Sequence, residues 1–256
     1  MQDSQVYNEL NKAWKSTCKI IFGEEIGELK EYEEWLKEYM PTIGKRKSVI
    51  SGKDVFLAYD KYCKNSNYIS LDERKEVSIE PLTINEIKDI DSIVEAISNK
   101  WYYVGNKTLG RSTLVEGCDV IFDSQVVADS FYIVNSSFVF ASSAIRDSKY
   151  VFGTTGIERN SEFIVRCTGA DNAKRCFEVR YGNTYSSDCY FGNNLENCSD
   201  LMFCFGQRNK RYMIGNLQLT KDKYFQIKSK LIEEIREELK KEKKFPSLYE
   251  LIGNDQ

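Results

Sequence analysis

The sequence predicts a mainly β protein in which a single-stranded parallel β-helix, or β-solenoid, is flanked by helices. Three observations support this fold class: a six-residue repeat in the middle of the chain, a mixed helix and strand pattern before it, and an apolar helical stripe after it. They divide the chain into an α+β N-terminal region at 1–104, a parallel β-helix at 105–218, and a C-terminal helix and tail at 219–256.

The N-terminal region begins with two segments in which apolar residues recur at helical spacing. The first predicted helix ends at Gly23, and the second covers residues 26–40 and ends before Pro41. Further along, residues 77–79 alternate as a strand does, and a capping-box pattern at 83–86 opens a third helix. The second helix has an acidic face that we interpret as solvated. Its members are Glu25, Glu28, Glu31, Glu33, Glu34 and Glu38.

Small residues recur every six positions through the middle of the chain, and an apolar pair follows each of them. A period of six fits short strands separated by tight corners, which is the pattern of a β-solenoid. We predict three such segments per coil, so that residues eighteen apart stack on one another at about 4.8 Å. The small residues are Ser112, Cys118, Ser124, Ser130, Ser136, Ser142 and Ser148.

Beyond Phe152 the spacing loosens, and strand-like segments follow at 161–165, 176–179, 187–191 and 199–203. Corners of variable length are typical of right-handed parallel β-helices, so the pattern favours a right-handed over a left-handed solenoid. After the last coil, an apolar stripe predicts a helix from about Thr220 to residue 242. We expect this helix to cap the solenoid and cover its strand edges, while a homo-oligomer contact through the helix or the solenoid end stays open.

The composition excludes several classes of function. The net charge of −3 argues against a wholesale polyanion binder, and the absence of histidine excludes imidazole bases and imidazole zinc ligands. No apolar run reaches the about 18 residues of a membrane span, and no export signal is present, so a cytoplasmic protein without membrane contact is predicted. Eight cysteines without a C-x-x-C pair predict reduced structural thiols, no metal site and no cofactor.

Two acidic residues are the weak catalytic candidates. In a coil of eighteen residues Asp129 and Asp147 would stack roughly 5 Å apart, where they could couple their titrations or bind a cation. This would suit a carbohydrate-active or lyase-type β-helix enzyme. Both residues precede a corner serine, however, and we favour a turn-stabilising hydrogen bond as their role.

A basic run is the candidate binding site. Its residues are Arg208, Asn209, Lys210, Arg211 and Tyr212. The cations could bind phosphates and the tyrosine could stack on a base, as in an RNA- or ribosome-associated factor. A solvated loop, or internal ion pairs with the acidic second helix, would explain the same residues without a ligand.

A resemblance becomes visible around this run. The stretch 194–206, the basic run and the segment 219–224 resemble the tail of uncharacterised Cys- and aromatic-rich β-solenoid proteins of archaea and candidate-phylum bacteria. The resemblance covers about the last fifth of the chain, and it implies a solenoid in a prokaryotic cytosol without implying an activity. Met213 stands where that pattern has cysteine, which puts a shared metal site in doubt.

These observations together predict a non-catalytic interaction or assembly protein that presents a rigid β-helix face to a protein partner. The prediction depends on the repeat scaffold and on the absence of any convergent catalytic motif in the sequence. The alternatives are the RNA- or ribosome-associated factor and the carbohydrate-active or lyase-type enzyme.

Overall fold

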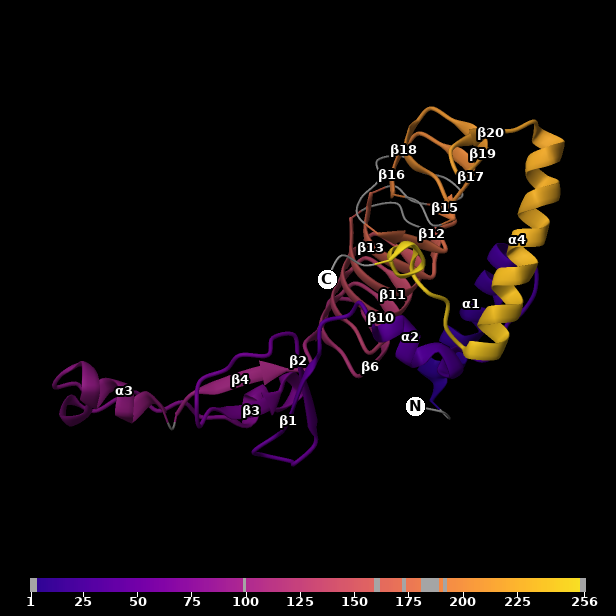
Figure 1. The fold of residues 1–256 in the computed structure, drawn as a ribbon. Helices are drawn as coiled ribbons and strands as arrows, with labels where there is room; N and C mark the ends of the chain where they lie inside the picture. Colours follow the sequence, from indigo (N-terminus) through magenta and orange to yellow (C-terminus); the bar gives the residue numbers. More distant parts are fainter. Residues whose placement is uncertain are drawn as a thin grey trace.

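The computed structural model describes residues 4–98, 100–158, 162–171, 174–180, 189–190 and 193–253. Figure 1 shows a parallel β-solenoid of about seven turns, helices along one of its flanks, and a small β-domain with a projecting helical segment at its N-terminal end. The predicted mainly β fold, with a parallel solenoid and flanking helices, is confirmed. Parts of two predicted strands, at residue 161 and around 187–188, lie outside the described residues.

The strands of the solenoid belong to successive coils that stack in parallel. Val139 pairs with Val127 in the coil before it and with Val151 in the coil after it, so each coil holds twelve residues. The predicted coil of eighteen residues is therefore wrong: two hexads, and not three, complete one turn. The strands are β5 (Thr108–Leu109), β6 (Thr113–Glu116), β7 (Asp119–Phe122), β8 (Gln125–Ala128), β9 (Phe131–Val134), β10 (Ser137–Arg146), β11 (Lys149–Glu158), β12 (Glu162–Ile164), β13 (Arg166–Asp171), β14 (Glu178–Arg180), β15 (Cys189–Tyr190), β16 (Asn193–Glu196), β17 (Ser199–Met202), β18 (Phe205–Arg208), β19 (Arg211–Ile214) and β20 (Leu217–Gln218).

The backbone turns at two positions of each hexad, where residues adopt left-handed φ angles. In the coil 124–135 these residues are Val126, Asp129, Tyr132 and Asn135, with φ angles of 57°, 47°, 56° and 49°. A left-handed L-residue costs about 1–2 kcal/mol, so these turns persist only because the stacked coils hold them in place.

Through the first coils the bore of the solenoid is filled by one β-branched residue from each hexad. Ile133 and Val139, which the repeat predicts to point inward, are both fully buried. Each packs on the equivalent residue of the neighbouring coil, because the register brings Ile133 beside Ile145 and Val139 beside Val151. The column consists of Ile121, Val127, Ile133, Val139, Ile145, Val151 and Ile164.

The recurring small residues form hydrogen-bonded ladders beside the bore. The Ser142 amide donates to Ser130 Oγ at 3.1 Å, and the Ser130 amide donates to Cys118 Sγ at 3.4 Å, one coil earlier. Ser130 Oγ in turn donates to the Ala128 carbonyl at 2.7 Å. A small side chain that both accepts and donates is therefore required at this corner of each hexad.

We expect Ser130→Ala to lower the free energy of unfolding by about 1–3 kcal/mol, because the buried Ser142 amide loses its acceptor. Ser130→Cys should cost less, since Cys118 already fills the equivalent position one coil earlier and donates to the Glu116 carbonyl. Urea denaturation followed by circular dichroism measures both variants. An alanine variant as stable as the unmodified protein would show that the ladder does not hold the coils together.

One outer flank of the solenoid is covered by helices (Figure 1). The described helices are α1 (Gln5–Phe22), η1 (Leu29–Tyr32), α2 (Glu33–Lys37), η2 (Leu71–Glu76), η3 (Ile84–Glu86), α3 (Ile90–Ser98), α4 (Lys221–Glu242) and α5 (Leu248–Ile252). The covered column is Ala128, Phe140, Phe152, Val165, Phe177, Tyr190 and Met202, and it forms one apolar cluster with α1, α2 and α4. Trp14 of α1 packs edge-on against Phe152 with ring centroids 5.4 Å apart, and Phe22 packs against Phe177 at 5.0 Å.

The helix boundaries follow local signals in the sequence. Ser4 caps α1 by accepting from the Tyr7 amide at 3.1 Å, and Gly23 ends it with a left-handed φ of 85°. The second predicted helix is shorter than expected, because Gly27 adopts a φ of 138° and the helical conformation begins only at η1. The C-terminal helix is confirmed as α4, and it runs along the flank instead of lying across the solenoid end (Figure 1). That end is closed by β20, which pairs antiparallel with β19.

A small β-domain precedes the first coil. It consists of an antiparallel pair, β1 (Gly44–Lys47) with β2 (Asp54–Leu57), and a parallel pair, β3 (Asn67–Ser70) with β4 (Tyr102–Gly105). Asn106 links it to the solenoid by accepting from the Phe56 amide at 2.8 Å and donating to the Asp54 carbonyl at 2.9 Å. The strand predicted at 77–79 does not form, and this segment instead leads into residues 79–98, which we call the arm.

Candidate functional site

The two acidic candidates do not meet. In a coil of twelve residues Asp147 stacks on Asn135, whereas Asp129 lies half a coil away. Asp129 is covered by α2, where Lys37 Nζ lies 2.6 Å from its carboxylate, while Asp147 is exposed. Burial raises the pKa of the Asp129 carboxyl although Lys37 opposes this shift. The predicted stacking of Asp129 on Asp147, on which the enzyme alternative depended, is therefore wrong, because each coil holds twelve residues and not eighteen.

The turn role predicted for Asp129 and Asp147 stays a prediction. Another corner acid, Asp123, lies one coil before Asn135 and forms a hydrogen bond between coils. Its Oδ1 accepts from the Arg111 amide at 2.8 Å, so the carboxylate satisfies a backbone group of the preceding coil. Asp119 acts in the same way at the start of the solenoid, where its carboxylate accepts from the amides of Lys107 and Ala58 at 2.9 and 2.8 Å.

The basic run lies in the last coil and not in a loop. Arg208 ends β18, Asn209 and Lys210 form the corner, and Arg211 and Tyr212 begin β19. The twelve-residue register places Glu196 beside Arg208, and their side chains form an ion pair at 2.6 Å. Two cations of the run are thus positioned by the preceding coil, since Arg211 pairs in the same way with Asp200 at 3.0 Å.

Tyr212 and Asn209 are engaged within the fold. The Tyr212 ring lies 5.7 Å from the ring of Tyr224 and 6.0 Å from that of Phe225, at the start of α4. Asn209 Oδ1 accepts from Asn197 Nδ2 at 2.6 Å, again one coil earlier. Of the five residues of the run, only the exposed Lys210 makes no ion pair, side-chain hydrogen bond or ring contact among the described residues.

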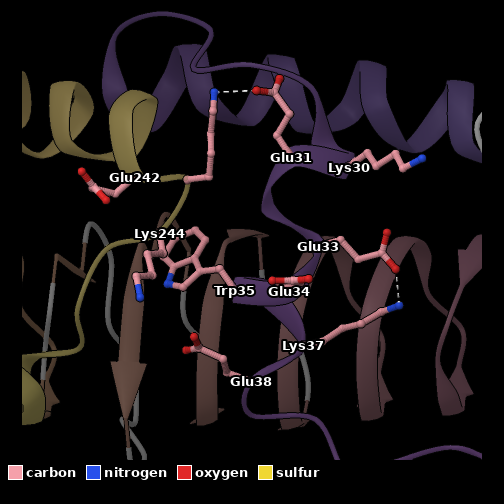
Figure 2. A pocket seen from close by; sticks show the side chains of 10 residues that line it. Lys30, Glu31, Glu33, Glu34, Trp35, Lys37, Glu38, Glu242 and Lys244 are labelled. Atoms are coloured by element: carbon pink, nitrogen blue, oxygen red, sulfur yellow. Dashed lines mark hydrogen bonds and ion pairs between the residues drawn. The ribbon is translucent and has the colours of Figure 1, made fainter.

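The structure shows a charged cleft that sequence reasoning missed. It has a volume of about 610 Å³ and lies between η1, α2 and the segment that follows α4 (Figure 2). Five carboxylates and four lysines line it around Trp35, and Figure 2 shows the Glu33–Lys37 pair at 2.5 Å. Positive and negative side chains are mixed around the cleft, so it does not present a surface of one charge to an ionic ligand.

Much of the acidic face that we interpreted as solvated is paired. Glu31 binds Lys243 beyond the end of α4, Glu28 binds Lys15 of α1, and Glu38 binds Arg166 of the solenoid. These partners come from three different segments, which sequence spacing alone does not bring together. The acidic face therefore forms ion pairs that link the helices to one another and to the coils.

Arg166 is the buried member of these ion pairs. It is only 1% exposed, and its guanidinium lies 3.0 Å from Glu38. The guanidinium also lies over the rings of Trp35 and Tyr39, at 4.9 and 4.1 Å from their centroids. Cation–π contacts of this kind contribute about 0.5–2 kcal/mol each, so the two rings help to hold the Arg166 guanidinium in place.

The structure describes seven cysteine side chains. Six of these seven are buried, while Cys63 is exposed. Burial raises the pKa of Cys18, Cys118 and Cys204, which keeps them protonated. Cys118 and Cys204 occupy the ladder position of the hexads, where each Sγ donates to a backbone carbonyl. Within the described part of the chain, no three His, Cys, Asp or Glu side chains are arranged to hold a metal ion.

The arm is the second feature that sequence reasoning did not single out. Figure 1 shows α3 at the far end of the β-domain, directed away from the solenoid, and none of its nine residues, all described, is buried. Ile84 and Ile90 are each 78% exposed and Val94 is 55% exposed. These aliphatic side chains are therefore left largely uncovered by the described residues.

Comparisons with protein families, with curated proteins and with solved structures find no match to this chain. Among the described helices, none combines the length and the apolar composition that crossing a bilayer requires. Inferences about function therefore come from the surfaces of the molecule itself.

Proposed function

We propose that the protein is a non-catalytic interaction or assembly protein, in which the rigid solenoid and its β-domain present the arm to a macromolecular partner. The observation that supports this proposal is the row of exposed aliphatic residues on the arm. Isolated exposed apolar residues are ordinary on protein surfaces, but several large aliphatic residues exposed within one short segment mark an interaction site. The stripe consists of Ile84, Ile87, Ile90 and Val94, all exposed.

Co-purification of the untagged protein from its own cells tests the proposal, with nuclease treatment before the final step. We expect the unmodified chain to purify as a complex, either with another protein in constant ratio or with further copies of itself, and we expect the triple variant Ile84→Ser, Ile90→Ser and Val94→Ser to lose that complex. The matched control is Ile20→Ser with Val49→Ser, which removes exposed aliphatic residues elsewhere on the surface. A partner that the arm variant retains would contradict the proposal.

The RNA-associated alternative is supported by one observation. The exposed cations Lys210, Lys221 and Lys223 at the end of the solenoid form no ion pair with any described residue. If RNA binds there, changing all three to glutamate should abolish a salt-dependent mobility shift of labelled RNA. The absence of a shift at low salt for the unmodified protein would remove this alternative.

A further inference from the structure

The arm and the segment at the C-terminal end of the solenoid carry opposite net charge. The arm contains five acidic residues, Glu80, Glu86, Asp89, Asp91 and Glu95, against the single basic residue Lys88. Glu86 is paired with Lys100 at 3.2 Å, whereas Asp91 and Glu95 of α3 form no ion pair among the described residues. The arm is therefore an acidic surface with an aliphatic stripe.

The opposite surface lies at the C-terminal end of the solenoid, in residues 205–230, which we call the acceptor end. This segment contains seven lysines and arginines against the single acid Asp222. It also exposes large apolar side chains: Phe205 is 61% and Leu217 is 64% exposed, and Phe225 is exposed as well. The Asn216 side chain accepts from the Phe205 amide at 3.0 Å and donates to the Phe205 carbonyl at 3.1 Å. Phe205 and Leu217, which follows Asn216, are therefore neighbours at the end of the solenoid.

The arm cannot reach the acceptor end of its own chain in this structure. Figure 1 shows the arm directed away from the N-terminal end of the solenoid, whereas β18, β20 and the beginning of α4 lie at the other end. Any pairing of the two surfaces must therefore join two molecules.

We propose that the arm of one copy docks on the acceptor end of a second copy. The aliphatic stripe would cover Phe205, Leu217 and Phe225, while Asp91 and Glu95 face lysines such as Lys221 and Lys223. This proposal names the partner in the proposed function and depends on it. Because the two surfaces differ and lie at opposite ends, the contact is heterologous and builds head-to-tail chains or rings instead of isologous dimers.

Charge complementarity predicts how the association responds to salt. Contacts between exposed charges weaken as ionic strength rises, since the Debye length falls to about 3 Å at 1 M salt. A single short helix on an exposed surface also makes a small interface, which implies reversible association that depends on protein concentration.

Sedimentation velocity on the full chain tests the proposal. We expect the weight-average mass to rise above the 29.7 kDa of one chain as the protein is concentrated at low salt, and to return to that value at about 1 M NaCl. A donor variant, Ile90→Ser with Val94→Ser, and an acceptor variant, Lys221→Glu with Lys223→Glu, should each stay monomeric. Mixed together, they should form a one-to-one complex that grows no further, because one intact arm meets one intact acceptor end.

Three results would overturn this proposal. One is a monomeric unmodified protein at all concentrations, with or without RNA binding to the acceptor end. Another is self-association that the donor variant retains. The third is an acceptor variant that still associates with itself, which would show arm-to-arm pairing. A monomeric protein whose arm variant nevertheless loses a co-purifying partner would refute the head-to-tail contact and leave the proposed function standing.

Discussion

Ile133→Asp is expected to be the most damaging single substitution in the solenoid, with a loss of about 3–5 kcal/mol in the free energy of unfolding. Ile133 is fully buried in the bore between Ile121 and Ile145 of the adjacent coils. A carboxylate there has no cation or amide within the apolar column to compensate its lost hydration. The loss is a large share of the about 5–15 kcal/mol that stabilises a domain.

The solenoid amplifies this effect, because each coil is stabilised mainly by contacts with its two neighbours. A charge in the coil 124–135 therefore uncouples the coils on either side, and urea denaturation should broaden as well as shift to lower concentration. The control is Lys149→Asp, an exposed position on β11 where the change should stay within about 0.5 kcal/mol. If the two variants unfold at the same urea concentration, Ile133 does not lie in a packed bore.

The six-residue repeat was sufficient to predict the solenoid and its bore. An inward position must recur in every coil, so the apolar column is visible as a period in the sequence. The number of hexads per coil was not determined by that period, since any whole number of hexads preserves it. The alternation of the hexads is weak in the sequence. Ala128, Phe140 and Phe152 recur every twelve residues, and Arg146 occupies the equivalent place between the last two, but Val134 between the first two is also apolar.

The partners of the basic run depend on the same register. Arg208 and Glu196 are twelve residues apart, so a coil of twelve residues would have predicted their ion pair, whereas a coil of eighteen hides it. The exposure of the arm is a different case. Its apolar stripe predicts a helix that packs on something, but sequence periodicity does not say whether the surface that it packs on belongs to the same chain.

Gly153→Ala should displace α2 from the solenoid, and its comparison with Gly156→Ala isolates that effect. Both glycines have left-handed φ angles, 68° and 70°, so an added Cβ costs both of them the same about 1–2 kcal/mol of backbone strain. They differ in their surroundings. A Cβ on Gly153 would lie 2.4 Å from the Leu36 carbonyl oxygen and 2.8 Å from its Cα, whereas nothing lies within 4 Å of a Cβ on Gly156.

Leu36 cannot yield by rotating its side chain, because the clash is with its backbone, so α2 must move as a unit. Overpacking of this kind costs about 1–3 kcal/mol, which we expect as the difference in unfolding free energy between the two variants. Trp35 of the same helix is 3% exposed and packs against Arg166 and Phe177, so its displacement should raise the quenching of tryptophan fluorescence by acrylamide in Gly153→Ala alone. Equal stability and equal quenching in the two alanine variants would contradict a close backbone contact between α2 and the coil, and with it the covered flank of the solenoid.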